Sequence, residues 1–524
     1  MTPRATDDPL AAGLRLPYGR PEEVEVYGLL RDQVQRFLAR SVDARAIDRA
    51  GRLDPSVREG AAAAGLFGLT ISEAYGGAGL SLQAACSIVQ ALACHDRAVA
   101  ILVGLHAGLG SRPLTASGNE GLRARYLPAM ASGERVAAFA ATEAGAGSDL
   151  TAVRTTASRA GEVLRLTGEK SYVTNGGFAG VFTVLAQTPG LGGARAMSLL
   201  CVPRETPGIE VGPEEDKLGI RGSSTVTVCF DGAAVPLDHL VGSAGRGMDE
   251  AHRALEWGRT LMAAGSTGTA QAALALTLAH VATRRQFGRP LREFPTVRAQ
   301  VSDMAAQVFA MESLVRHAGV LEASRAPLAM TSLAAKIYAS EAAWAVCDRA
   351  VQLHGALGFV ESAGAARLLR DCRITRIFEG ANDVLLLRGG LALLSTPASS
   401  APLDPATAGP LGAPAAAYRT LTARLDAARA AARAAYGVGV VHQQLLLQAL
   451  CRAEVCRAAA FAAATRGACG EDPHAYGLAA RATESLVREG MRHLDDAARA
   501  VDDAAETQAM SAQIYGEDRK EPPQ

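Results

Sequence analysis

The sequence predicts a mainly helical protein with a compact β domain in its middle and a further helical domain appended at its C-terminal end. Three observations carry this prediction. Ala-rich helical periodicity flanks the middle of the chain, β-branched and alternating segments occupy the middle itself, and a Pro- and Ser-rich run interrupts the chain near residue 400. With 524 residues, of which 49% are hydrophobic, the chain can bury a large core.

The first part of the chain comprises an N-terminal extension over residues 1–24 and a helical domain over 25–135. The turn signals YGGAG and SGNEG divide that domain into several helices. The extension lacks the apolar region of a secretion signal, and no run of about eighteen apolar residues occurs in the chain. We therefore expect a soluble, cytoplasmic protein.

The middle domain, residues 136–245, contains segments such as VLRLTGEKSYVTN, GVFTVLAQT and STVTVCFDG, which are typical of strands separated by Gly, Pro and Asp. Helical periodicity returns over residues 246–395, where long helices are expected to pack against one another. It is clearest where six apolar residues recur in alternating steps of four and three, and so share one helix face: Val297, Val301, Met304, Val308, Met311 and Val315.

The last part of the chain begins with a linker over residues 396–414, whose Pro, Ser and Gly content is too high for a folded element. Helical periods of Ala, Leu and Arg then return over residues 415–524. They predict an appended helical domain.

Charge and cysteine content exclude two classes of function. Lys plus Arg and Asp plus Glu are 53 each, and no region has the basic excess of a nucleic-acid-binding protein. The nine cysteines include no CxxC pair, and most lie in apolar stretches. They indicate buried thiols in a reducing compartment, not disulfides or a metal site.

Two segments of the middle domain could hold a bulky, flat ligand. FAATEAGAGSDL follows a strand and contains Gly145 and Gly147, which allow close backbone approach. KSYVTNGG places Tyr172 and Thr174 before a Gly-Gly turn, where an aromatic ring and a hydroxyl could face a cofactor. Each segment alone is explained equally well as a tight turn or an ordinary strand end.

A third segment, RIFEGAND, places Glu379 directly before a glycine. Taken alone, such a glutamate is explained by an exposed helix start near Arg373 and Arg376. Its meaning therefore depends on the other motifs in the chain.

Together, ATEAGAGSD, SYVTNGG, DKLGIRGSST, RRQFG, QLHGALGF and RIFEGAND resemble, in order and spacing, the acyl-CoA dehydrogenase family. The likeness covers about residues 25–516. It points to the very-long-chain branch through GVFTVLAQTP, KIYASEAAWAV and the helical tail VHQQLLLQALCRAEV. The resemblance implies an N-terminal helical domain, a β-barrel-like middle domain and a C-terminal four-helix bundle. It also implies FAD between the β domain and the bundle, with a second subunit completing the active site.

By this resemblance Glu379 is the base that removes the α-proton of an acyl-CoA thioester, while hydride passes to flavin N5 and trans-2-enoyl-CoA forms. Gly380 would let the chain turn where the backbone holds the thioester carbonyl, and Arg259 would lie near both. Ala100 and Gly104 share one helix face and would form the floor of the acyl pocket. Their small size predicts a preference for long acyl chains, although close helix packing explains them too.

The resemblance also assigns cofactor contacts, and it places those in RRQFG and QLHGALGF across the subunit boundary. Ser148 would face CoA. The residues expected to contact FAD are Ala141, Thr142, Tyr172, Thr174, Arg284, Gln286, Phe287, Gln352, Gly355, Ala356 and Asn382. Arg284 suits the FAD diphosphate because its guanidinium is forked, whereas Arg285 is explained as a surface residue.

The sequence departs from the family at two of these positions. Tyr172 stands where most relatives have Trp, and Ala381 stands where they usually have Thr. The second change is expected to remove one hydrogen bond to the cofactor, worth about 1 kcal/mol. Asn382 could compensate in part.

The leading interpretation is a homodimeric, FAD-dependent acyl-CoA dehydrogenase of fatty acid β-oxidation that passes electrons to an electron-transfer flavoprotein. One alternative is a biosynthetic dehydrogenase or oxidase acting on carrier-protein-bound acyl groups, and another is a scaffold or assembly role. The appended domain could contact a membrane peripherally. However, the Ala- and Leu-rich helix expected at 440–466 favours a buried bundle.

Overall fold

The fold is described from a computed structural model that covers residues 23–193, 196–396, 411–468 and 473–502. Most of the expected N-terminal extension and of the expected linker lies outside these residues. The chain divides into two compact units between Ala381 and Asn382, and each unit is described by itself.

The N-terminal part of the first unit is helical. Its helices are α2 (Val24–Ser41), α3 (Ala44–Ala50), α4 (Pro55–Ala63), α5 (Leu82–His95), α6 (Arg97–Leu105), α7 (Arg112–Ser117) and α8 (Glu120–Ser132). Five of them begin at a side-chain oxygen that accepts a backbone N–H of the first turn, from Asp43, Asp54, Ser81, Asp96 and Asn119. Helices α5 and α6 are buried over most of their length, because their own apolar residues are spread over all faces of each helix.

A single π-helical turn, η5 (His106–Gly110), follows α6 and packs against both β1 (Val136–Ala140) and the long helix α9 (Gly247–Thr283). A Cβ at Gly110 would lie 2.7 Å from the Ala137 Cβ, and one at Gly108 would lie 2.9 Å from the Leu261 Cδ1. The Ala137 N–H donates a hydrogen bond to His106 Nδ1 over 2.9 Å. Glycines at this turn therefore permit three parts of the unit to meet closely.

The middle of the chain forms one mixed sheet. Its strands are β1 (Val136–Ala140), β2 (Thr156–Ala160), β3 (Val163–Thr174), β4 (Ala179–Gln187), β5 (Met197–Pro203), β6 (Ile209–Glu214), β7 (Thr225–Pro236) and β8 (Leu240–Val241). The order is β6-β7-β3-β2-β4-β5-β8, and β1 pairs with β4 in parallel. The side chains on the two faces of β4 and β5 enter two separate apolar clusters. Both faces of each strand are therefore buried, and both strands have continuous apolar sequences.

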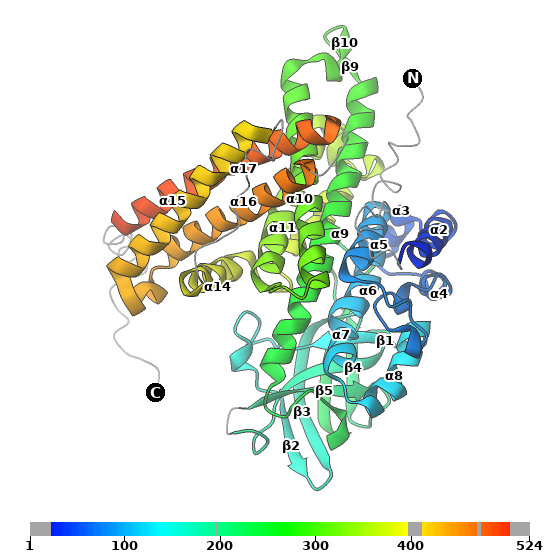
Figure 1. Ribbon diagram of the computed structural model, residues 1–524. Helices are drawn as coiled ribbons and strands as arrows, with labels where there is room; N and C mark the ends of the chain where they lie inside the picture. The colour runs from blue at the N-terminus through cyan, green and yellow to red at the C-terminus, as the bar shows by residue number, and fades with distance from the viewer. Residues whose placement is uncertain (1–22, 194–195, 397–410, 469–472, 503–524) are drawn as a thin grey trace, which may run out of the picture. The chain divides into compact units, whose positions relative to one another are not determined.

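Three long helices follow the sheet: α9 (Gly247–Thr283), α10 (Pro295–Ala323) and α11 (Ala329–His354). Helix α9 runs from the β domain to a hairpin, β9 (Arg285–Gln286) and β10 (Arg289–Pro290), at the other end of the unit (Figure 1). It lies close against α5, since a Cβ at Gly268 would fall 2.1 Å from the Gln90 carbonyl oxygen. Two short helices, α12 (Ala356–Phe359) and α13 (Ala365–Arg373), complete the unit.

The second unit contains α14 (Asn382–Ser395), α15 (Gly412–Tyr436), α16 (Gln444–Ala468) and α17 (Pro473–Asp502). Helix α14, which sequence reasoning groups with the preceding bundle, packs on α16 so closely that a Cβ at Gly390 would lie 2.3 Å from the Leu447 carbonyl oxygen. Arg429 closes the end of α14 by donating to the Leu393 and Thr396 carbonyls over 2.5 and 2.6 Å. Most Ala and Leu side chains of α16 are buried.

The arrangement confirms the predicted fold class, a mainly helical chain with a central β domain and additional C-terminal helices. No helix in the described ranges has a stretch long and apolar enough to cross a bilayer.

Candidate active site

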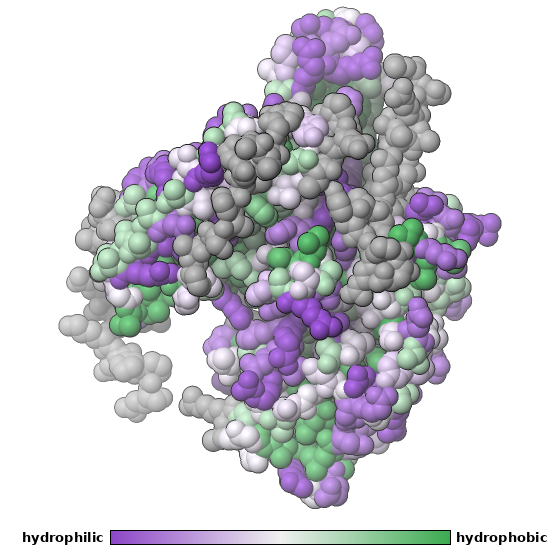
Figure 2. Space-filling model, in the orientation of Figure 1, coloured by the Kyte–Doolittle hydropathy of each residue, from purple (hydrophilic) through white to green (hydrophobic). Residues whose placement is uncertain are grey.

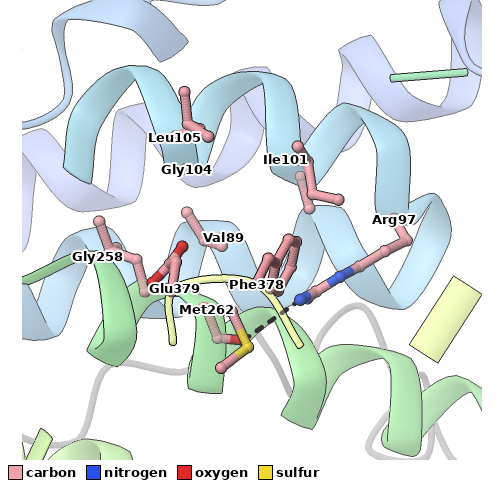
Figure 3. Close-up of a pocket in the computed structure, with 11 residues that line it drawn as sticks. Val89, Arg97, Ile101, Gly104, Leu105, Gly258, Met262, Phe378 and Glu379 are labelled. Carbon is pink, nitrogen blue, oxygen red and sulfur yellow. Dashed lines mark hydrogen bonds between the residues drawn. The ribbon is translucent and has the colours of Figure 1, made fainter. Parts of the chain in front are cut away.

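A cavity in the first unit lies between α5, α6, α9 and the turn that carries Glu379 (Figure 3). Its empty volume is about 340 Å³, part of it open to solvent. Helix α6 turns one face toward it, because its lining residues recur at helical spacing. The lining residues are Val89, Arg97, Ala100, Ile101, Gly104, Leu105, Gly258, Leu261, Met262, Phe378 and Glu379. The two small residues predicted for the acyl pocket, Ala100 and Gly104, are among them.

Glu379 stands on a sharp reversal of the chain. Its φ is +56°, in the left-handed region that costs a bulky residue on the order of 1–3 kcal/mol, and Gly380 follows at φ +102°. Two cationic side chains hold this backbone: Arg259 Nε donates to the Glu379 carbonyl over 3.1 Å, and Lys336 Nζ donates to the Gly380 carbonyl over 2.8 Å. The turn is therefore fixed by residues from α9 and α11.

The Glu379 carboxyl group itself is left available. Its Oε2 is sealed from solvent and accepts no hydrogen bond within the described part of the chain. Burial raises the pKa of Glu379 to about 7, although Arg259, Lys336 and Arg97 act in the opposite direction. A carboxyl group that ionises near neutral pH and has a free acceptor oxygen is suited to remove a proton.

Gly258 makes room for this carboxyl group on the α9 side. A Cβ at that position would lie 3.2 Å from Glu379 Oε2 and 2.6 Å from Leu109 Cδ2. Any larger residue would therefore press on the base and on η5.

The structure brings two of the predicted cofactor segments side by side. The Ser171 N–H donates to the Thr142 carbonyl over 2.9 Å, and Lys170 Nζ donates to the Ala141 carbonyl over 3.0 Å. Glu143 closes the loop by accepting from Lys170 Nζ over 2.8 Å. Although burial alone would raise the pKa of Glu143, its hydrogen bonds lower it to about 2. The Ala141–Thr142 loop is thus rigidly tied to β3.

Tyr172 extends from this junction into solvent. The residue is 66% exposed and its φ is +55°, at a β-bulge between Lys170 and Val173. Nearby, Asn175 Nδ2 donates to the Leu102 carbonyl over 3.0 Å, which fixes the end of this segment to α6. An aromatic ring held in solvent by a strained backbone is suited to a flat ring system.

Backbone strain of this kind collects in the predicted motifs. Of the six non-glycine residues with positive φ in the described ranges, only Arg325 falls outside them, and the other five are Tyr172, Asn175, Ile220, Phe287 and Glu379. A strained backbone conformation costs free energy and persists only where the surrounding structure holds it in place. Such conformations are concentrated at ligand-binding and active sites.

Six of the residues predicted to contact the cofactor lie near the far end of α9. Arg284, Gln286 and Phe287 belong to the exposed hairpin region. This region lies at the top of Figure 2, where the surface is mainly hydrophilic. Three more of the six are also exposed, namely Gln352, Gly355 and Ala356. They lie near this end of α9, because the ring of His280 on α9 stacks on the ring of His354 with their centroids 4.2 Å apart. One chain therefore does not bring these residues together with Thr142 and Tyr172.

The other predicted residues have simpler placements. Ser148 is exposed and Thr174 is partly buried. Ala381 ends the first unit and offers no side-chain donor, and Asn382 begins α14 in the second unit.

Sequence reasoning missed Arg97 and Lys336. Arg97 follows a helix-capping aspartate, a pattern typical of an exposed helix start, yet its side chain lines the cavity and is 2% exposed. Lys336 is fully buried, and burial lowers its pKa to about 7. Its place inside the apolar segment SLAAKIYAS was the available signal.

One group of possible metal ligands occurs within the described residues, although the sequence predicts none. The ligand atoms of Cys456, Glu489 and His493 lie within 4.8 Å of one another in the second unit. The imidazole of His493 already pairs with Glu489 and Asp496 at 3.8 and 3.7 Å. We assign no metal to this group.

Fold and site together define a helical–β–helical protein with a buried carboxyl group in a largely apolar cavity. Family models described as the N-terminal, middle and C-terminal domains of acyl-CoA dehydrogenase match residues 25–134, 138–233 and 245–394. The chain belongs to the acyl-CoA dehydrogenase family.

Individual relatives agree with this assignment. The chain is 35% identical over 362 residues to the mitochondrial very long-chain specific acyl-CoA dehydrogenase of Bos taurus, a match that covers 68% of this chain and 55% of the relative. The chain therefore spans about half the length of that relative.

Solved structures resemble the chain as well. An acyl-CoA dehydrogenase complexed with FAD from Bacillus anthracis superposes with a TM-score of 0.82 at 25% identity, covering 98% of this chain and 96% of that one. Butyryl-CoA dehydrogenase from Megasphaera elsdenii superposes with a TM-score of 0.67 at 31% identity, covering 74% and 98%.

Proposed function

We propose that the protein oxidises acyl-CoA thioesters to trans-2-enoyl-CoA. The observation that carries this proposal is the buried, unbonded carboxyl oxygen of Glu379 in a cavity lined mainly by apolar side chains. The reaction removes a proton from the α-carbon and a hydride from the β-carbon, and a double bond forms between them. Glu379 takes the proton, and its pKa near 7 makes the carboxylate available at neutral pH.

The residues of the chain fit FAD as the cofactor. The strained, exposed Tyr172 ring and the tied Thr142 loop suit a flat ring system, and the exposed hairpin with Arg284 suits a diphosphate. When bound, FAD supplies a two-electron oxidant that accepts the hydride. Ala141, Thr142, Tyr172 and Thr174 would hold one end of it.

The backbone at Glu379 has its own role in this proposal. In the described part of the chain the Glu379 N–H has no hydrogen-bond acceptor, and Arg259 and Lys336 hold the adjoining carbonyls. That N–H is available to polarise the thioester carbonyl, which stabilises the charge that develops when the α-proton leaves. Gly380 allows the chain to turn away afterwards.

The acyl chain would lie along α6. Ala100 and Gly104 line the cavity there, and residues this small fill little of its space. This supports the preference for long over short acyl groups. Faster turnover of butyryl-CoA than of every longer thioester would contradict it.

We propose two partners. A second copy of the chain would bring Arg284, Gln286 and Phe287 to the cofactor, because a single chain holds them at the opposite end of α9 from the β domain. An electron-transfer flavoprotein would accept the electrons. Oxidation of the reduced enzyme by molecular oxygen, measured as hydrogen peroxide formed, would instead favour the oxidase alternative.

The proposal is tested by incubating the purified holoenzyme with octanoyl-CoA and palmitoyl-CoA and an artificial electron acceptor. Mass spectrometry should find a product two hydrogens lighter than the substrate, formed by the wild type and not by Glu379→Gln. The same acyl groups on an acyl-carrier protein serve as a comparison. A wild-type holoenzyme that oxidises carrier-bound but not CoA-bound groups would overturn the choice of substrate.

A further inference from the structure

The acyl cavity contains a buried arginine that the proposed reaction does not use. Arg97 lies on the same face of α6 as Ile101 and Gly104, and its guanidinium points back into the site toward Met262 (Figure 3). A side chain of this kind is unexpected in a pocket for a purely alkyl chain.

The guanidinium of Arg97 is poorly satisfied by the protein. Arg97 Nη2 donates a long hydrogen bond to the Met262 carbonyl, over 3.4 Å. Its Nε is sealed from solvent and donates to no acceptor in the described ranges. Burial lowers the pKa of Arg97 to about 10, so the group stays protonated at neutral pH. A buried cation with unused donors requires an anion or an acceptor.

The acidic groups that face Arg97 do not pair with it. Glu379 and Asp371 are the carboxyl groups that interact with it electrostatically, and neither lies within ion-pair distance of it in the described structure. Asp371 is engaged by Arg367 at 3.2 Å and by the Ile220 N–H at 2.5 Å. Glu379 must remain free to act as the base.

The fold also makes a dedicated slot for this head group. A Cβ at Gly265 of α9 would lie 1.9 Å from Arg97 Nη1. The guanidinium therefore occupies space that only glycine leaves open at that position of the helix. Glycine has a lower helix propensity than alanine, so Gly265 makes this space for the guanidinium while lowering the stability of the helix.

We propose that Arg97 selects acyl-CoA thioesters whose chain carries a carboxylate at its far end. This inference rests on the proposed function and names its substrate class. The guanidinium offers two parallel N–H groups, the geometry that matches a carboxylate. A methyl-ended chain of the same length would cover Arg97 with methylene groups and leave its charge unpaired.

The test compares kcat/KM for pairs of CoA thioesters of equal length, one ending in a methyl group and one in a carboxylate, from glutaryl up to hexadecanedioyl. For wild-type holoenzyme the carboxylate member should be preferred by about 100-fold at the lengths that reach Arg97. Preference for the methyl member at every length would overturn the proposal, and this comparison needs no variant.

Variants locate the effect. Arg97→Met should abolish the preference, and Gly265→Ala should weaken it by displacing the head group. Arg112→Met is the control, because it removes a partly buried arginine that stacks on Trp257 at 3.7 Å, outside this cavity. It should keep the wild-type preference. Persistence of the preference in Arg97→Met would also refute the proposal.

The outcomes separate this inference from the proposed function. Oxidation of methyl-ended but not carboxylate-ended thioesters would overturn the role of Arg97 alone. Oxidation of no CoA thioester by flavin-loaded wild type would overturn the proposed function.

Discussion

Replacing Glu379 by Gln is expected to stabilise the fold while abolishing activity. Burial raises the pKa of this carboxyl group from 4.5 to about 7, which means that the folded state binds its proton more tightly than the unfolded state. The folded state is therefore favoured while the group is protonated. Wild-type stability falls by about 1.4 kcal/mol per pH unit as pH rises from 4.5 to about 7, and the total loss is on the order of 3 kcal/mol.

Glutamine at position 379 avoids this loss because it carries no charge. The difference between variant and wild type should be near zero at pH 4.5 and should reach its maximum above pH 7. For a unit of this size it corresponds to about 4 °C in apparent melting temperature, measured at one scan rate on flavin-loaded protein. Glu205→Gln is the control, since Glu205 pairs with Arg135 at the surface at 2.8 Å and its pKa is lowered. It should give no gain at pH 8. A Glu379→Gln difference that is independent of pH, or negative at pH 8, would refute the account of the buried base.

Three further predictions concern the same turn and the cofactor. The kcat/KM of the wild type should rise about tenfold per pH unit below pH 7 and level off above it, because the base must be ionised in the free enzyme. A kcat/KM that does not change from pH 5.5 to 8 would contradict the assigned pKa of Glu379. Gly258→Ala should lower kcat at least tenfold, because the added Cβ would lie 3.2 Å from Glu379 Oε2. Gly439→Ala is the control, because a Cβ at that position would meet nothing within 4 Å. Ala381→Thr should raise the fraction of protein that retains flavin after dialysis, by restoring a hydrogen bond worth about 1 kcal/mol; unchanged retention would show that this position does not contact the cofactor.

Much of the fold could be predicted because its signals are local. The apolar face of α10 and the alternating strands of the β domain follow from helical and strand periodicity. The pairing order of the sheet did not follow, because the parallel contact of β1 with β4 joins segments separated by a long stretch of chain. The packing of α14 on α16 depends on Gly390, and close contact between helices leaves little trace in periodicity.

The candidate site was partly predictable for a different reason. Glu379, Tyr172 and Thr142 stand in motifs that a family resemblance identifies, and the structure adds the strained backbone that presents them. Arg97 could not be found in this way. Its position after a helix cap suggests solvent, and only the tertiary packing of α9 around Gly265 shows that its guanidinium is inside the cavity.

The most direct test of the central claim is anaerobic mixing of purified, flavin-loaded protein with an acyl-CoA thioester. The proposed function predicts loss of the yellow flavin absorbance within one turnover for the wild type, and no loss for Glu379→Gln carrying the same amount of flavin. Bleaching at an equal rate in both proteins would show that Glu379 is not the base. A wild-type protein that binds no flavin at all would contradict the proposed reaction itself.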